Sequence, residues 1–272
     1  CTAKCQNIVH CVHFSWPWQR KAVLFFAHLA YRKNSYRLKQ NALDYQGCED
    51  SLEKTLVKTL MVFYFSGTGN SKHVAQCLAM ASGESCISIA DCMQKDEFSF
   101  SLYEGERVGF VTPVYFWGLP DIVIRFVRQL SLTGLQQNFI YHVVTFGTTT
   151  GQAHYMMQEL LNNKGLWLDA KYNVRMVDVW TPIFDVSDHE KCLRKSEKAE
   201  KNIARTTERV VARKAGNFDY LRFPHWLAHW YYLSYDNQRK TKHFHVIKDK
   251  CIGCNKCARQ CPEQAITCKD GF

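Results

Sequence analysis

Short apolar runs alternate with longer amphipathic stretches from about residue 60 onward. The apolar runs predict buried strands at residues 60–65, 86–90, 108–115, 139–146 and 172–177. Apolar residues at helical spacing predict a helix through Val74, Leu78 and Ala81, and further helices at about residues 119–130, 151–163 and 188–214. This alternation predicts an α/β fold built on a doubly wound parallel sheet of five strands.

The segment after the first predicted strand changes abruptly from apolar to small residues. It consists of Ser66, Gly67, Thr68, Gly69, Asn70 and Ser71. A glycine-containing loop that leads into a helix directs backbone N–H groups and the positive end of the helix dipole at one point, where hydroxyl groups add donors. No lysine follows the second glycine as in a P-loop, and Lys72 stands where a dinucleotide fingerprint needs its third glycine. The segment therefore predicts a phosphate-binding turn, with an ordinary strand-to-helix turn as the alternative.

Two more loops follow predicted strands and should lie at the same edge of the sheet, where ligands of such sheets bind. The first consists of Pro113, Val114, Tyr115, Phe116, Trp117 and Gly118. Three consecutive aromatic residues in a surface loop favour contact with a flat ligand, although two of the three can instead point into the core. The second loop is rich in glycine and hydroxyl groups, and its candidates are Thr145, Phe146, Gly147, Thr148 and Gly151.

Residues 66–71 resemble the FMN phosphate loop of flavodoxins, a Ser/Thr-x-Thr-Gly-x-Ser/Thr pattern at the end of the first strand. The resemblance implies a flavodoxin-like, FMN-binding domain at residues 59–180. In flavodoxin-like proteins the loop after the third strand lies beside the flavin, so Tyr115, Phe116 and Trp117 are candidates to cover the isoalloxazine, with Trp117 as the first choice. The loop at residues 145–151 is similar to the second flavin-contacting loop of that family, whose backbone N–H groups reach the pyrimidine edge.

A run of cysteines near the C-terminus has the spacing C-x2-C-x2-C-x3-C-P. Its members are Cys251, Cys254, Cys257 and Cys261, followed by Pro262. This is the bacterial ferredoxin run, in which three thiolates at three-residue steps hold one 4Fe-4S cluster. A structural zinc site is the weaker alternative, because it usually separates two Cys-x2-Cys pairs by a longer loop.

The cysteine run resembles half of a two-cluster ferredoxin. In such ferredoxins the fourth cysteine of a run binds the other cluster, so Cys261 is not the natural fourth ligand of the first. A second run should follow, yet the sequence stops at Phe272. We therefore expect residues 248–272 to be a truncated, small α+β ferredoxin-like domain, with two clusters in the complete protein and poor or no cluster binding by this chain.

Charge and cysteine distribution narrow the class of protein. The net charge of +10 is uneven, since residues 61–180 carry 8 Lys and Arg against 10 Asp and Glu, whereas residues 181–250 carry 15 against 9. Glu and Lys at four-residue steps favour a solvated helix face over a nucleic-acid, membrane or acidic-protein interface. Four of the 13 cysteines lie in the C-terminal run, which favours metal ligation in a reducing compartment such as the cytoplasm. We expect no nucleic-acid partner and no membrane span.

The remaining segments carry no assigned chemistry. Residues 1–58 precede the first methionine of the chain, Met61, and we expect an extension outside the folded core. Residues 181–247 should form a helical and aromatic connector that packs on the core. Within it, Trp226, Trp230 and Leu233 share helical spacing. We expect an aromatic cluster to pack the connector against the core or against the next domain; its members are Tyr220, Phe223, Trp226, Trp230, Tyr231, Tyr232 and Tyr235.

The resemblances to a flavodoxin and to a bacterial ferredoxin together imply electron transfer between FMN and 4Fe-4S clusters, with separate redox proteins as donor and acceptor. An FMN-dependent oxidoreductase of a quinone or another small acceptor is the alternative, with the cluster as an electron relay. No general acid or nucleophile is placed well enough to prefer an enzyme. A third class, a module without redox activity in which the cluster only staples the tail, would be indicated by the absence of bound flavin.

Overall fold

The computed structural model describes residues 61–83, 85–181, 183–219, 224–238, 246–247 and 251–268. The expected extension at residues 1–58 lies outside the described residues. No helix in the described part is both long and apolar enough to cross a membrane.

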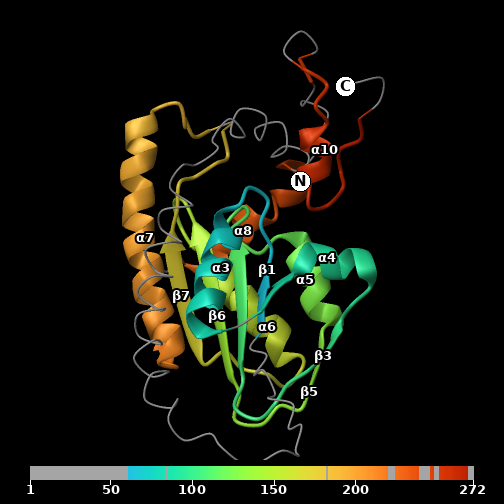
Figure 1. Ribbon diagram of the computed structural model, residues 1–272, viewed down its shortest axis with the longest axis vertical. Coiled ribbons are helices and arrows are strands. Elements are labelled where there is room, and N and C mark those ends of the chain that lie inside the picture. Colours follow the sequence, from blue (N-terminus) through green and yellow to red (C-terminus); the bar gives the residue numbers. More distant parts are fainter. Residues whose placement is uncertain are drawn as a thin grey trace, which may run out of the picture. The chain divides into compact units, whose positions relative to one another are not determined.

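A parallel sheet forms the centre of the fold (Figure 1). Its order is β2-β1-β4-β6-β7-β8, and every neighbouring pair is parallel. The strands are β1 (Met61–Tyr64), β2 (Ser85–Ser88), β4 (Arg107–Pro113), β6 (Phe139–Phe146), β7 (Ala170–Arg175) and β8 (Gly216–Asn217). Because β1 lies between β2 and β4, the winding direction of the chain reverses there. A ligand-binding crevice is expected at the carboxyl ends of β1 and β4.

The sheet has six strands, so the expectation of five is wrong by one. The additional strand, β8, contains only Gly216 and Asn217 and therefore has no apolar run that could reveal it. The strand expected at residues 86–90 also ends early, because the Ser88 hydroxyl accepts the Asp91 N–H at 3.2 Å and caps a helix, α4 (Ile89–Lys95). A separate pair of short parallel strands, β3 (Ser99–Ser101) and β5 (Ser131–Thr133), was not expected either.

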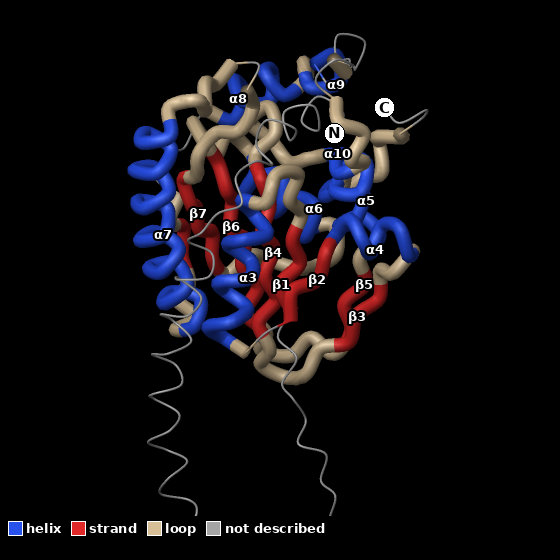
Figure 2. Tube along the Cα trace, turned by 45° about the horizontal axis from the view of Figure 1, so that its top comes forward, coloured by secondary structure: helices blue, strands red, loops and turns tan. Residues whose placement is uncertain are grey.

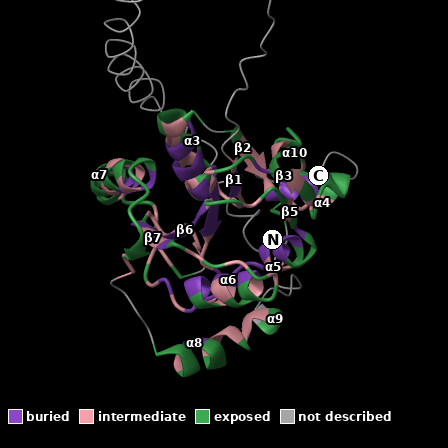
Figure 3. Cartoon of the chain, turned by 90° about the horizontal axis from the view of Figure 1, so that it is seen from below, coloured by how far each residue is buried: buried purple, intermediate pink, exposed green. Residues whose placement is uncertain are grey.

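Helices cover both faces of the sheet (Figure 2). On one face lie α3 (Asn70–Ser82) and α7 (His189–Val211), and on the other α4, α5 (Asp121–Gln129) and α6 (Ala153–Asn162). The helices expected through Val74, at 119–130, at 151–163 and at 188–214 are thus confirmed, with shorter bounds for the last three. Figure 3 shows the long α7 with exposed residues around most of its surface, as its charge pattern indicates.

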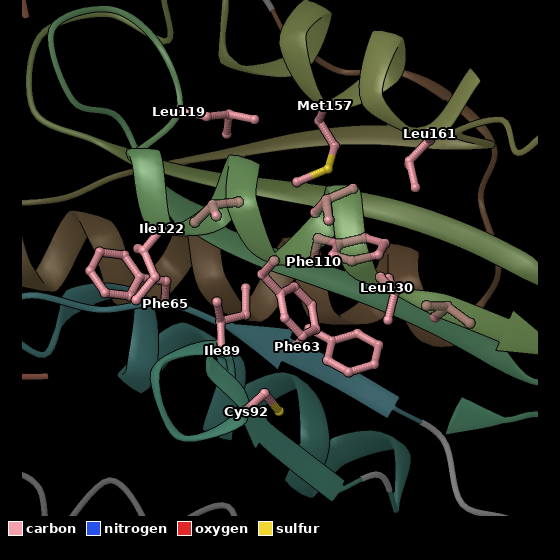
Figure 4. Packing of buried hydrophobic residues seen from close by; sticks show 14 of the residues in the cluster. Phe63, Phe65, Ile89, Cys92, Phe110, Leu119, Ile122, Leu130, Met157 and Leu161 are labelled. Carbon is pink, nitrogen blue, oxygen red and sulfur yellow. The ribbon is translucent and has the colours of Figure 1, made fainter. Parts of the chain in front are cut away.

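The core on the α5 side combines aromatic rings with aliphatic side chains (Figure 4). Phe63 on β1 is fully buried and lies 5.6 Å from the Phe110 ring and 5.4 Å from the Phe126 ring, centroid to centroid. A polar chain is buried in the same layer. Thr112 Oγ1 lies 2.9 Å from His142 Nε2, and His142 Nδ1 lies 3.0 Å from His154 Nδ1. Burial lowers the pKa of both histidines, so the pair is neutral and ties β4 and β6 to α6.

The connector forms α8 (His225–Tyr232) and α9 (Tyr235–Gln238), and the cysteine run contains α10 (Lys256–Gln260). Within the expected aromatic cluster, Trp226 and Trp230 are each 72% exposed, and Leu233, which shares their helical spacing, is 64% exposed. The opposite side of α8 makes the contacts instead, chiefly through Tyr231 and Tyr232. Helical spacing alone identified a helix face but not which face is buried.

A charged contact joins α3 to α7. His73 Nε2 lies 2.7 Å from Glu200 Oε1. A hydrogen bond with Cys77 and a second one with Glu200 raise the pKa of His73 to about 10. His73 is therefore protonated at neutral pH and forms an ion pair with the carboxylate.

We expect His73→Gln to lower the free energy of unfolding at pH 6 by about 1 kcal/mol or less, because Glu200 is 46% exposed and water screens the pair. The ordinary histidine pKa, about 6.5, applies to the unfolded chain. Because the pKa is higher in the folded state, the ion pair stabilises the protein fully below pH 6.5. This stabilisation disappears as the pH rises toward 10. Urea unfolding of wild type and variant should therefore converge between pH 6 and pH 10.

The control is Glu190→Gln. It removes an exposed carboxylate from the Glu190–Arg194 pair of α7, the helix that also carries Glu200. A difference between wild type and His73→Gln that stays constant or grows with pH would contradict the assignment.

Candidate functional site

A cleft opens at the carboxyl edge of the sheet, where four loops meet. Its lining comes from the ends of β1, β4, β6 and β7. The lining residues are Ser66, Gly67, Thr68, Asn70, Ser71, Pro113, Val114, Tyr115, Thr145, Phe146, Gly147, Met176, Val177, Asp178 and Val179. The structure thus brings together most of the predicted site residues, and it adds a fourth loop.

The turn at residues 66–71 contains a hydrogen bond between its first and fourth residues. Gly69 has φ +103°, a conformation that favours glycine, and its N–H donates to Ser66 Oγ at 3.0 Å. The N–H groups of Gly67, Thr68, Asn70 and Ser71 donate to no residue that the structure describes. These donors stand at the N-terminus of the 13-residue helix α3, so the turn is suited to an anion.

The two serine hydroxyls of the turn have internal partners. Ser66 Oγ accepts the Gly69 N–H, and the buried Ser71 Oγ lies 2.7 Å from Thr145 Oγ1 at the end of β6. The second bond joins the turn at residues 66–71 to the end of β6. Thr68 differs, because its half-buried hydroxyl has no hydrogen bond to any described residue and lines the cleft.

The aromatic loop after β4 forms a tight hairpin. The N–H groups of Tyr115 and Gly118 each donate to the other residue's carbonyl at 2.9 Å, and both residues between them have positive φ, 47° for Phe116 and 64° for Trp117. Tyr115 lines the cleft, whereas Phe116, Trp117 and Gly118 do not. The Trp117 ring lies 4.4 Å from the Tyr231 ring on α8, centroid to centroid. Covering of a flavin by Trp117 stays a prediction, and in this structure the ring contacts the connector.

The loop after β6 divides into two parts. Gly147 lines the cleft, and its carbonyl accepts the Arg175 Nε–H at 2.9 Å. Thr148 and Gly151 do not line the cleft. Gly151 has φ +54°, and a Cβ there would lie 2.2 Å from the Trp117 carbonyl oxygen. Because Gly151 has no side chain, the loop after β6 can approach the loop after β4 closely.

Sequence reasoning missed the loop after β7, residues 176–179, because we expected that strand to continue to residue 177. The Met176 N–H donates to the Phe146 carbonyl at 2.8 Å, and Asn70 Nδ2 donates to the Val177 carbonyl at 3.0 Å. These bonds hold the loop across the cleft. Its place after a parallel strand was the signal available in the sequence, since all such loops lie at one edge.

Aromatic rings gather around Phe116, in the loop after β4. Phe116 contacts Trp180, Tyr231 and Tyr235, with ring centroids 5.4, 5.9 and 5.4 Å away. Tyr232 reinforces this contact, because its hydroxyl donates to the Leu119 carbonyl at 2.7 Å. The connector therefore packs on the aromatic loop through tyrosines that carried no helical-spacing signal.

The cysteine run curls through two left-handed residues, Gly253 with φ 65° and Asn255 with φ 56°. Cys261 is buried and its Sγ accepts the Ala265 N–H at 3.3 Å, whereas Cys254 is exposed and Cys251 and Cys257 are half-buried. Thiolates at this spacing are the donor set that an iron–sulfur cluster uses. In the described part of the chain, no three His, Cys, Asp or Glu side chains converge as metal ligands.

Polar contacts connect the cysteine run to α4 and α5. Gln94 on α4 donates to the Pro262 carbonyl at 3.1 Å and accepts from Gln264 at 2.9 Å. Arg125 on α5 lies 3.4 Å from the Glu263 carboxylate. Another hollow lies between α5 and α6, away from these residues and from the cleft; its lining includes Ile124, Arg128, Met156 and Glu159.

Comparison with known proteins gives two family matches. A model described as "Flavodoxin domain" matches residues 61–222, and one described as "4Fe-4S binding domain" matches residues 243–266. No curated protein matches the chain.

Solved structures with similar folds include flavodoxin 1 from Bacillus cereus, at 20% identity over 53% of this chain and 97% of that one, with a TM-score of 0.31. The azoreductase from Bacillus anthracis str. Sterne is 9% identical, covers 57% of this chain and 99% of its own, and has a TM-score of 0.37. Rubredoxin oxygen:oxidoreductase from Desulfovibrio gigas is 18% identical over 58% of this chain, with a TM-score of 0.31; the match spans only 37% of that protein.

The contact between Gly151 and Trp117 gives a stability prediction. Both Gly151→Ala and Gly165→Ala place alanine at positive φ, which costs about 1–2 kcal/mol. A Cβ at Gly165 meets nothing within 4 Å, whereas a Cβ at Gly151 meets the Trp117 backbone. Urea unfolding should therefore show Gly151→Ala to be less stable than Gly165→Ala by about 2 kcal/mol. Equal stability of the two variants would show that the loops are not in close contact.

Proposed function

The chain belongs to the flavodoxin domain family, which matches residues 61–222 of its 272, and on this premise we propose that it passes electrons between FMN and a 4Fe-4S cluster. The flavodoxin domain implies FMN, and the 4Fe-4S binding domain implies the cluster. When bound, FMN supplies one- or two-electron chemistry and the cluster supplies one-electron chemistry.

In this proposal the turn at residues 66–71 holds the FMN phosphate. The N–H groups of Gly67, Thr68, Asn70 and Ser71 donate to it, and the Thr68 hydroxyl adds a donor. Charge-assisted hydrogen bonds from backbone N–H groups are about twice as strong as neutral ones, so this turn supplies most of the polar recognition. The loops that contain Tyr115, Gly147 and Asp178 form the walls around the remainder of the cofactor.

In this proposal the cysteine run supplies the cluster ligands. It replaces the expectation of poor or no cluster binding, because the 4Fe-4S binding domain matched at residues 243–266 implies a cluster. Cys251, Cys254 and Cys257 hold iron in this proposal, and Cys261 completes the set or serves another cluster. Gln94 on α4 and Arg125 on α5 contact residues 262–264, so the cysteine run is attached to two helices of the sheet domain. This attachment is the observation that supports the proposal, because electron exchange within the protein needs both cofactors held by one molecule.

The chemistry of the cleft favours a carrier over an enzyme that transforms a substrate. Among the described lining residues, the titratable side chains are Tyr115 and Asp178, with no histidine, cysteine or lysine. Proton transfer to a substrate usually needs a group that titrates near neutral pH. We therefore propose that donor and acceptor are separate redox proteins. Steady-state turnover of a quinone, without any redox protein present, would favour the oxidoreductase alternative.

We expect the double variant Thr68→Ala/Gly69→Val to lose bound FMN while it remains folded. Valine at φ +103° is strained, so the turn must rearrange and its N–H groups no longer converge. Flavin absorbance of the purified protein measures retention, and circular dichroism measures folding. Gly165→Val is the matched control, since φ there is +72° and the site lies outside the cleft. Unchanged flavin content in the double variant would refute the phosphate site.

We expect Cys254→Ser to lower the iron and sulfide bound after anaerobic reconstitution, because it removes a thiolate from the run. Cys268→Ser is the control, since Cys268 is also exposed but lies outside the run. The ratio of iron to protein, measured by chemical analysis, should fall by at least about half in the first variant and stay at the wild-type value in the second. Equal iron content in both variants would show that Cys254 is not a ligand.

A further inference from the structure

Asp178 is the only carboxylate among the described residues that line the cleft. Its side chain lies directly against Gly147, where a Cβ would be 2.3 Å from Asp178 Oδ2. Asp178 Oδ1 accepts the Trp180 N–H at 3.1 Å, whereas Oδ2 accepts no hydrogen bond from a described residue. The carboxylate is half-buried in the wall of the cleft, so it lies next to whatever occupies the cleft.

Neighbouring contacts fix this charge in place. The Asn70–Val177 hydrogen bond ties the loop to the start of α3, and the Trp180 ring packs 5.4 Å from Phe116. A positively charged side chain, Arg175, contacts the cleft lining, because its Nε–H donates to the Gly147 carbonyl. Arg175 is exposed, so solvent screens its charge more than that of Asp178.

We propose that the Asp178 carboxylate lowers the redox potential of the flavin bound in this cleft, because its negative charge disfavours the reduced form. This inference rests on the proposed function. Reduction at neutral pH adds two electrons and one proton to the ring, so it leaves one additional negative charge in the cleft. The electrons come from the donor protein, or from dithionite in a titration. A fixed carboxylate in the same cleft raises the free energy of that charge and lowers the midpoint potential.

The test is a potentiometric titration of FMN-loaded wild type, Asp178→Asn and Asp185→Asn at pH 7. Asparagine at residue 178 keeps the oxygen that accepts the Trp180 N–H and removes only the charge. Asp185 is the matched control, because its Oδ1 accepts the Ser187 N–H two residues later in the same manner, yet it is exposed and lies outside the cleft.

The affinity for reduced FMN divided by the affinity for oxidised FMN should be about tenfold higher in Asp178→Asn than in wild type. This is the order of magnitude expected when one half-buried unit charge is removed. For two electrons, tenfold corresponds to a rise in midpoint potential of about 30 mV. Asp185→Asn should leave the potential unchanged. The difference between wild type and Asp178→Asn should also decrease with added salt, because screening weakens the charge.

An unchanged or lowered potential in Asp178→Asn, or an equal shift in Asp185→Asn, would overturn the inference. Asp178→Ser, which keeps a hydroxyl acceptor near the Trp180 N–H, provides a second neutral variant if asparagine prevents folding. Failure of wild type to bind FMN would refute the proposed function itself. Normal FMN binding with unchanged potentials would refute only the role of Asp178.

Discussion

The described structure depends on one constraint at the end of β1, where backbone donors must converge without finding partners inside the protein. Two features maintain this arrangement. Gly69 adopts a left-handed conformation that returns its own N–H to Ser66, and the buried Ser71–Thr145 hydroxyl pair anchors the first turn of α3 to β6. Both features use small residues, because a larger side chain at Gly69 would strain the turn and a larger one at Ser71 would push α3 away from β6. The neighbouring donors are then left for an anion.

The sheet places this turn where it can meet other loops. Because β1 lies between β2 and β4, the carboxyl ends of β1, β4, β6 and β7 open into one cleft. The core below is well packed, with Phe63 against the Phe110 and Phe126 rings on one face and Tyr141 and Tyr172 buried on the other. Loops supported in this way can hold polar groups at fixed positions, as electron transfer through a bound cofactor requires.

The sequence predicted those parts of the fold in which a local pattern determines structure. Apolar runs predicted the five longer strands, and the small residues at 66–71 predicted a loop that leads into a helix. Phosphate binding by that loop stays a prediction. The two-residue strand β8 was missed because two residues carry no pattern. The contribution of Val177 and Asp178 to the cleft was missed because the strand was expected to continue to residue 177, whereas β7 ends at Arg175. The contact of Val177 with Asn70, 107 residues earlier, has no local pattern that could reveal it. Helical spacing did not predict which residues of α8 are buried. Trp226 and Trp230 share that spacing but are exposed, whereas Tyr231 contacts the Phe116 ring.

Recognition of a phosphate dianion by the turn at residues 66–71 is the central claim, and comparison of FMN with riboflavin tests it most directly. The two ligands share the ring and the ribityl chain and differ only in the phosphate. Titration calorimetry of the flavin-free protein should show FMN to bind more tightly by about 100-fold or more, because several charge-assisted hydrogen bonds are lost with riboflavin. Equal affinities for the two ligands would show that the turn does not bind phosphate.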